Sequence, residues 1–318
     1  MIRRGRATRA VLVLAGLALA VGACSGPRAS PPGVTARPTA APDALRVVAT
    51  TTVLADLVAQ VGGTNVSVVS LVPPGGEVHT FDPGPSDVVR VGDAQLVVIN
   101  GLGLDDWLAA LVTDAGSSAP IVGLGEDLPG VDYLAGDDPD GDEAVNPHLW
   151  LDVANARAYV ARIAAALAAA DPADAAAYEA GAAAYDARLA TLDEGIRAAT
   201  SAVPEANRRV VSFHEAFPYY AAAYGLEIVG TIIEAPGQDP SAGEIATLVD
   251  AIRSAGVRAV LTEAQFSPNL AETVAAEAGV PVVTDLHHDS LGDPPADTYE
   301  GMMAWNTDRI VGALKEAP

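Results

Sequence analysis

Three of the five histidines in this chain lie far apart in the sequence but in similar local settings. His79 lies in a loop rich in proline and glycine, His148 directly follows a proline, and His214 directly follows an apolar run. Imidazole is a common metal ligand and suits zinc well. Near the C-terminus, one carboxylate is a further ligand-type side chain. The sequence therefore predicts that four side chains meet at one metal ion: His79, His148, His214 and Asp289.

This predicted donor set has a definite coordination chemistry. Three imidazole nitrogens and one monodentate carboxylate oxygen fill the tetrahedral shell of Zn²⁺ and leave no open position, so the ion is held and does not activate water. If Asp289 binds through both oxygens, the shell becomes five-coordinate, and Mn²⁺, which prefers oxygen ligands, becomes acceptable. Because metal binding requires neutral imidazoles, we expect the affinity to fall as the pH drops below the histidine pKa.

Two further histidines, His287 and His288, lie directly before Asp289 in the sequence. Imidazole can ligate a metal, donate a hydrogen bond or lie at a surface. The sequence leaves three roles open for each of them: an alternative ligand, a hydrogen-bond donor to a ligand, or a surface residue.

Short apolar runs alternate with segments of helical spacing on both sides of His148. This alternation is typical of βαβ units, so the sequence predicts two α/β lobes with mainly parallel sheets. Ligands of such sheets bind beyond the carboxyl ends of the strands, where the loops with these histidines are expected. Strands are predicted at 45–51, 66–72, 95–100, 120–124, 209–213, 227–233, 259–262 and 281–284, and shorter helices at 53–61, 83–91, 104–112, 153–169, 218–224, 241–255, 269–278 and 299–314.

Between the lobes, an alanine-rich segment predicts a long helix over 172–202. Pro172 suits its first turn, and its larger apolar side chains recur on one face. At 1.5 Å per residue the helix is about 45 Å long. We expect it to act as a rigid strut, with the metal site in the cleft between the lobes. The expected division is an N-terminal lobe at 45–152, a helical region at 153–203 and a C-terminal lobe at 204–318.

The first 23 residues have the pattern of a secretory signal peptide. Basic residues precede an apolar run at 10–21, which is too short to span a membrane with margin and ends at Cys24, the only cysteine of the chain. Small residues before a lone cysteine resemble a bacterial lipoprotein cleavage site, so we interpret Cys24 as the lipid-bearing first residue of the mature chain. The alternative is an ordinary signal peptide with an incidental cysteine. Residues 24–44 have the composition of a disordered tether.

The mature chain is strongly acidic. Four of the 18 basic residues lie in the signal segment, which leaves 14 basic against 41 acidic residues, a net charge of −27. Such a surface repels nucleic acid and anionic lipid, which argues against a nucleic-acid-binding function. It attracts cations without selectivity, although solubility alone also explains it. The acidic segment 127–145 is likewise either a solvated surface loop or a collector of cations.

Five segments carry distinctive motifs. They are VPPGGEVHTFDPGPSD (Val72 to Asp87), NPHLWLD (Asn146 to Asp152), SFHEAFPYYAAAYGL (Ser212 to Leu226), TEAQFSP (Thr262 to Pro268) and HDSLGDPPADTYEGMMAWNTDRI (His288 to Ile310). In this order they resemble a known family, the periplasmic or lipid-anchored metal-binding proteins of zinc and manganese ABC transporters, of the ZnuA and TroA type. The resemblance covers most of the mature chain. It places ligands at His79, His148, His214 and Asp289, with TEAQFSP outside the ligand set.

The resemblance implies two α/β lobes joined by a long rigid helix, with the metal between them. It further implies a monomeric, extracytoplasmic solute-binding protein, lipid-anchored to the outer face of the bacterial cell membrane, that captures Zn²⁺ and delivers it to a membrane ABC permease. Zinc-specific members often carry a histidine-rich loop before the second ligand, whereas segment 127–145 contains no histidine. Manganese members often have a carboxylate in place of His214, which favours zinc here. Mn²⁺ binding by the same architecture is the alternative.

Two other classes of function remain as alternatives. A secreted zinc hydrolase needs an open coordination position and a general base; the chain has no HExxH motif, and the nearest candidate base is Glu215, beside His214. A binding protein for an organic ligand, such as a chelated iron or a corrinoid, would not need the histidines. The sequence therefore predicts a transport protein and not an enzyme.

Overall fold

The computed structural model describes residues 40–136, 145–233 and 236–316. The expected signal segment, Cys24 and most of the tether lie outside these residues, as do residues 137–144 of the acidic segment 127–145. An isolated antiparallel bridge joins Ala135 to Val145 within this segment. Within the described residues, no helix is both long enough and apolar enough to cross a membrane.

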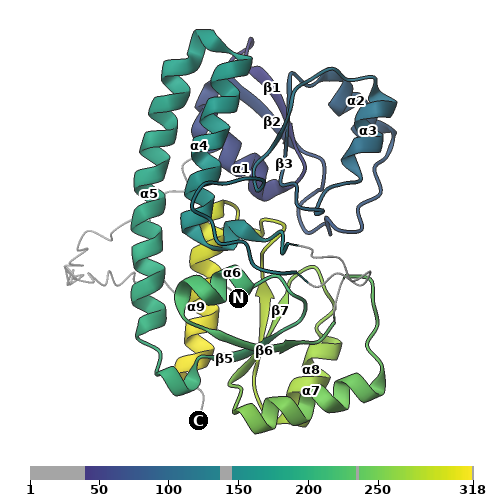
Figure 1. Cartoon of the computed structure of the whole chain (residues 1–318), viewed down its shortest axis with the longest axis vertical. Helices are drawn as coiled ribbons and strands as arrows, with labels where there is room; N and C mark the ends of the chain where they lie inside the picture. The colour runs from purple at the N-terminus through teal and green to yellow at the C-terminus, as the bar shows by residue number, and fades with distance from the viewer. Residues whose placement is uncertain (1–39, 137–144, 234–235, 317–318) are drawn as a thin grey trace, which may run out of the picture. The chain divides into compact units, whose positions relative to one another are not determined.

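The first four strands form one parallel sheet in the order β2-β1-β3-β4 (Figure 1). Helices cover both of its faces, as parallel sheets require. Along β1, Val47 and Ala49 pack into the core that contains α1, while Val48 packs with α2 and α3 on the opposite face. The elements are β1 Leu45–Ala49, α1 Thr52–Gly62, η1 Gly63–Asn65, β2 Val66–Ser70, α2 Pro85–Asp93, β3 Leu96–Ile99, α3 Leu108–Ala115 and β4 Ile121–Gly123.

The second sheet repeats this topology with the order β6-β5-β7-β8, again all parallel. In both sheets the first strand in sequence lies between the second and the third. A capping box begins α7: the Ser241 hydroxyl accepts from the backbone N–H of Glu244, and the Glu244 carboxylate accepts from the backbone N–H of Ser241. The elements are η4 Glu205–Asn207, β5 Arg209–Ser212, α6 Pro218–Tyr224, β6 Glu227–Thr231, α7 Ala242–Ala255, β7 Ala259–Glu263, α8 Asn269–Ala278 and β8 Val282–Leu286.

Helices connect the two sheets. The chain leaves the first lobe through η2 (Leu149–Leu151) and α4 (Val153–Ala170), turns at η3 (Pro172–Asp174), and continues through the 27 residues of α5 (Ala175–Ser201). At 1.5 Å per residue, α5 is about 40 Å long. It packs against α1 and α4 and also against α6 and the last helix, α9 (Tyr299–Glu316). The prediction of two parallel-sheet lobes joined by a long helix is confirmed, although Pro172 belongs to η3 and not to α5.

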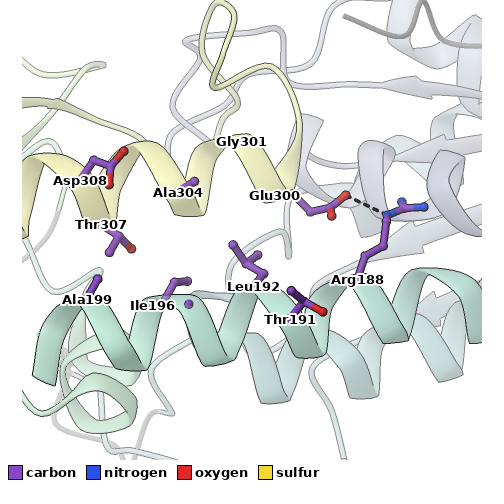
Figure 2. A pocket seen from close by; sticks show the side chains of 11 residues that line it. Arg188, Thr191, Leu192, Ile196, Ala199, Glu300, Gly301, Ala304, Thr307 and Asp308 are labelled. Atoms are coloured by element: carbon purple, nitrogen blue, oxygen red, sulfur yellow. Dashed lines mark hydrogen bonds and ion pairs between the residues drawn. The ribbon is translucent and has the colours of Figure 1, made fainter. Parts of the chain in front are cut away.

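The predicted apolar face of α5 is buried at Tyr178, Tyr185, Leu189 and Ile196. Leu192 is only half-buried. It lies in a groove between α5 and α9, opposite the small residues Gly301 and Ala304 (Figure 2). An ion pair between Arg188 and Glu300 also lies along this groove, with Nε and Oε2 3.3 Å apart.

The largest hydrophobic cluster is continuous between the lobes. It contains Val47 of the first sheet and Leu261 of the second, together with buried aromatic side chains of the connecting helices such as Tyr159, Tyr185 and Tyr299. Aromatic side chains bury a large apolar area each, so they dominate the stability of such a core. Because both sheets pack on the same helices, these helices hold the two lobes together on either side of the cleft.

Candidate metal centre

His79 lies in the loop that follows β2. Its backbone N–H donates to Oε1 of Glu77 at 3.0 Å. The indole of Trp107 donates to the carbonyl of Val78, also at 3.0 Å, which attaches the loop to the start of α3. The His79 side chain is 23 % exposed. The loop therefore presents this imidazole from the first lobe at the edge of the cleft.

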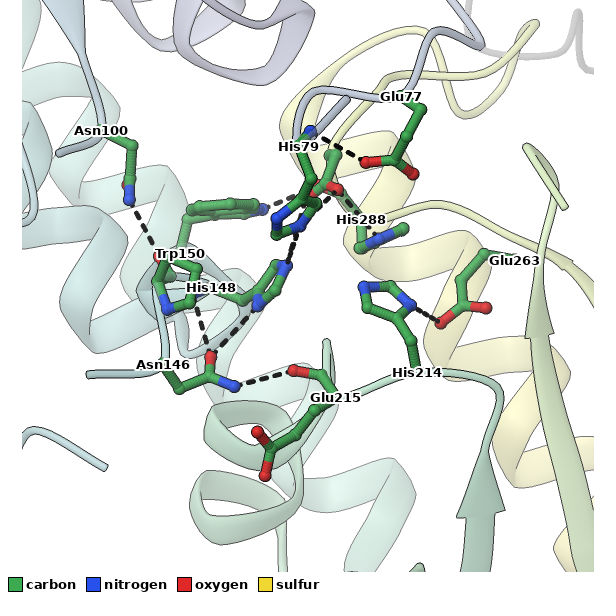
Figure 3. Close-up of polar contacts among 12 residues, drawn as sticks. Glu77, His79, Asn100, Asn146, His148, Trp150, His214, Glu215, Glu263 and His288 are labelled. Carbon is green, nitrogen blue, oxygen red and sulfur yellow. Dashed lines mark hydrogen bonds and ion pairs between the residues drawn. The ribbon is translucent and has the colours of Figure 1, made fainter. Parts of the chain in front are cut away.

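Asn146 orients His148. The Asn146 Oδ1 atom accepts from the backbone N–H of His148 at 3.0 Å and lies 3.1 Å from Nδ1 of its ring. This contact favours the tautomer with the proton on Nδ1, which leaves the lone pair of Nε2 for a metal. The other end of the amide donates to the backbone carbonyl of Glu215 at 2.7 Å. Asn146 thus connects the loop of His148 with that of His214 (Figure 3).

His214 comes two residues after β5, and Ser212 holds its backbone by donating a hydroxyl hydrogen bond to the His214 carbonyl at 2.7 Å. Nδ1 of the ring lies 3.0 Å from Oε1 of Glu263, the last residue of β7. A carboxylate on one nitrogen of a histidine fixes the ring and makes its other nitrogen a better metal ligand. Glu263 is therefore placed to orient His214.

Asp289 lies between the histidines at the carboxyl end of β8. Its Oδ2 is 3.6 Å from Nε2 of His79, its Oδ1 is 3.5 Å from Nε2 of His148, and the two Nε2 atoms are 3.3 Å apart. Ligands about 2.0–2.1 Å from a tetrahedral Zn²⁺ lie roughly 3.3 Å from one another. The structure thus brings together all four predicted side chains, with ligand atoms within 4.8 Å: His79, His148, His214 and Asp289.

Burial sets the protonation of the site. It lowers the pKa of His79 to about 4 and holds the pKa of His148 well below its usual value. Burial acts in the same direction on His214, but the Glu263 carboxylate, with help from Asp289 and Glu77, outweighs it and raises the pKa of that ring. At neutral pH the imidazoles of His79 and His148 are therefore neutral and ready to bind a cation.

The sequence left His287 and His288 undecided, and the structure separates them. His288 is fully buried, and its Nε2 lies 3.1 Å from Oδ2 of Asp289. His287 is less buried and faces away, with its Nε2 3.8 Å from Oδ1 of Asp285. Glu215, the candidate base of the hydrolase alternative, points its carboxylate away from the histidines (Figure 3). The roles of Asn146 and Glu263 were not predicted from the sequence, although both residues lie in the quoted motifs.

Comparisons with known proteins show which proteins this chain is similar to. The model of the family described as "Zinc-uptake complex component A periplasmic" (ZnuA) matches residues 47–313. The manganese-binding lipoprotein MntA of Halalkalibacterium halodurans is 33% identical over 86% of this chain and 90% of its own. The iron ABC transporter substrate-binding lipoprotein MtsA of Streptococcus pyogenes serotype M1 is 30% identical over 87% and 91%. The structure of the periplasmic zinc-binding protein TroA from Treponema pallidum superposes with a TM-score of 0.77, at 26% identity, over 85% of this chain and 99% of TroA.

Proposed function

We propose that this chain, which belongs to the ZnuA family of periplasmic zinc-uptake components, captures Zn²⁺ outside the cytoplasm and delivers it to the permease of an ABC transporter. The chain is a metal-binding substrate-binding protein of an ABC transporter, a transport component and not an enzyme. Its relatives are named for manganese, iron or zinc. The identity of the ion is therefore argued from the donor atoms.

The observation that carries the proposal is the donor set. We assign the ligands as His79, His148, His214 and Asp289, whose donor atoms lie within 4.8 Å of one another. Three nitrogens and one oxygen suit Zn²⁺ better than Mn²⁺, which prefers more oxygen ligands. A complete tetrahedral shell also leaves no position at which water is activated, which fits capture and delivery.

Mn²⁺ is the second candidate, and the placement of Asp289 favours it. Its two oxygens face different histidines, with Oδ2 toward His79 and Oδ1 toward His148. Neither oxygen has a hydrogen-bond partner among the described residues. Both oxygens are therefore available to one ion, and bidentate binding gives the five-coordinate shell that Mn²⁺ accepts.

The location of the protein is proposed from its N-terminus. We propose that residues 1–23 are a signal peptide and that Cys24 carries the lipid that anchors a monomeric mature chain to the outer face of the cell membrane. The relatives MntA and MtsA are named lipoproteins, which supports this assignment. In this arrangement residues 24–44 tether the folded part, with an N-terminal lobe at 45–152, a helical region at 153–203 and a C-terminal lobe at 204–318.

Elemental analysis of the purified protein tests the choice of ion, followed by competition between equimolar Zn²⁺ and Mn²⁺ for the metal-free form. We expect one zinc per chain and displacement of Mn²⁺ by Zn²⁺. Retention of Mn²⁺ against equimolar Zn²⁺ would establish the manganese alternative. A chain that binds neither ion would overturn the proposed function.

A further inference from the structure

A second group of buried donors lies beside the proposed centre. His214, Glu263 and His288 offer ligand-type atoms that lie within 4.8 Å of one another. All three residues are buried. They lie at the carboxyl ends of β5, β7 and β8, which are neighbours in the second sheet. This group shares His214 with the first centre but takes no donor from the first lobe.

The contacts of this group leave one carboxylate oxygen without a partner, beside the ring of His288. Oε1 of Glu263 is 3.0 Å from Nδ1 of His214, but Oε2 of Glu263 has no hydrogen-bond partner among the described residues. Nε2 of His288 is 3.1 Å from Oδ2 of Asp289 and 3.1 Å from the amide nitrogen of Gln265. A buried carboxylate with an oxygen that lacks a partner is costly, and a cation beside it removes that cost.

We propose that His214, Glu263 and His288 form a second zinc-type site, held by the second lobe alone, and that one ion moves between this site and the four-residue centre. Two imidazole nitrogens and a carboxylate oxygen are donors that suit Zn²⁺ and Co²⁺. The inference rests on the proposed function, since it concerns the same ion in the same cleft.

The geometry of His214 makes the two sites exclusive. Its Nδ1 faces Glu263, and its other ring nitrogen is directed toward His79 and His148 (Figure 3). A neutral imidazole has only one acceptor nitrogen. His214 therefore serves one ion at a time, and the protein holds one ion in either of two places.

Asp289 gives the ion a continuous path between them. On one side its oxygens lie 3.6 Å and 3.5 Å from Nε2 of His79 and of His148, and on the other side 3.1 Å from Nε2 of His288. An ion that leaves the first-lobe ligand His79 thus meets new donors before it has lost all the old ones. The second site is therefore a step in release, in which the ion is bound only by the second lobe.

Removal of His79 and His148 from the full chain tests the proposal. We expect His79→Ala/His148→Ala to bind one Zn²⁺ per chain by calorimetry, at least about 100-fold more weakly than wild type, because loss of a ligand costs more than loss of an outer partner. Adding His288→Ala or Glu263→Gln should abolish this residual binding. Adding His287→Ala, the neighbouring histidine that faces Asp285, should leave it intact. No zinc binding by the double variant, alongside one zinc in wild type, would overturn the inference and leave the proposed function standing.

A milder pair of variants covers the case in which the double variant does not fold, as judged by circular dichroism. His79 is the most exposed of the four donors, so His79→Ala should fold. We expect His79→Ala/His288→Ala to bind Zn²⁺ at least about tenfold more weakly than His79→Ala, an effect of the size expected for loss of a metal contact. Equal affinities of this pair, or two zinc ions per wild-type chain, would also overturn the inference. A wild-type chain that binds no zinc would overturn the proposed function and the inference together.

Discussion

His79 and the pair His148–His214 all supply imidazole ligands, but they differ in their exposure and in the contacts that hold them. The His79 side chain is 23 % exposed, while those of His148 and His214 are each 3 % exposed. The loop of His79 is held at Val78 by Trp107 of its own lobe. The other two histidines are joined by the Asn146 amide, which contacts the ring of His148 and the backbone beside His214.

This difference indicates which donor moves when the ion leaves. Trp150, two residues after His148, donates its indole N–H to the carbonyl of His288 at 2.8 Å. His148 is thereby attached to the second lobe, along with His214 and Asp289. A small withdrawal of the His79 loop opens the shell, whereas movement of His148 requires that several buried hydrogen bonds break, each worth about 0.5–1.5 kcal/mol.

The largest expected effect on Zn²⁺ affinity comes from removing His148, and comparison with removal of His79 tests which donor is fixed. We expect His148→Ala to lower Zn²⁺ affinity by more than about 100-fold, since this ligand is fixed and buried. His79→Ala should lower it less, because the three remaining donors keep their positions, and should speed dissociation. Competition with a chelator measures the affinities, and stopped-flow mixing measures the rates. If the two variants lose the same affinity and release Zn²⁺ at the same rate, there is no distinction between a moving and a fixed donor.

Asn146 should have the next largest effect. Asn146→Ala removes the acceptor for His148 and the link to Glu215, and we expect a 10- to 100-fold loss of Zn²⁺ affinity, as is typical of outer partners of a metal ligand. Asn146→Asp keeps an acceptor for the His148 ring but loses the N–H that donates to Glu215. If the two variants bind zinc equally, orientation of His148 is not the role of this amide.

The pH dependence of Zn²⁺ binding should distinguish His214 from the other two histidines by its protonation. Burial lowers the pKa of His79 and of His148, so neither binds a proton near neutral pH, whereas the Glu263 carboxylate and its acidic neighbours hold the pKa of His214 above its usual value. Below that pKa a metal must displace one proton. We therefore expect Zn²⁺ affinity to fall about tenfold per pH unit from about pH 6 to about pH 5, below the usual pKa of a histidine and above that of His79. A slope of two or three protons by calorimetry in several buffers would contradict these assignments.

The sequence predicted the helices and strands better than the side-chain contacts between them. Helices α6 and α8 begin and end at the predicted residues, 218–224 and 269–278, and a glycine follows each of them. Helix α3 begins four residues later than expected: residues 102–107 form turns, directly after a run of positive φ at Gly101, Leu102 and Gly103. Local sequence patterns therefore predict the ends of a helix only where the neighbouring residues have the usual negative φ.

The parts of the site that the sequence did not reveal depend on tertiary contacts. His287 and His288 are adjacent, and which of them points inward depends on the chain direction after β8. Asp285 near the end of that strand has φ 64°, an uncommon left-handed conformation for a residue other than glycine. Nothing in the local pattern predicts this value. The pairing of Glu263 with His214 likewise requires that β7 lie beside β5, which only the sheet order establishes.

The smallest expected effect on zinc affinity concerns substitutions in the long helix α5. Gly181 of α5 lies against α1, where an added Cβ would come 2.2 Å from the backbone oxygen of Val61. Gly181→Ala should therefore destabilise the fold by about 1–3 kcal/mol through overpacking, as measured by urea denaturation of the metal-free protein. Gly195 on the same helix meets nothing within 4 Å, so Gly195→Ala should stabilise by about 0.5–1 kcal/mol through helix propensity. Because α5 contributes none of the four donors, both variants should retain wild-type Zn²⁺ affinity. A loss of affinity in Gly181→Ala alone would mean that the α1–α5 contact sets the position of His79, and that this donor is less free than its exposure indicates.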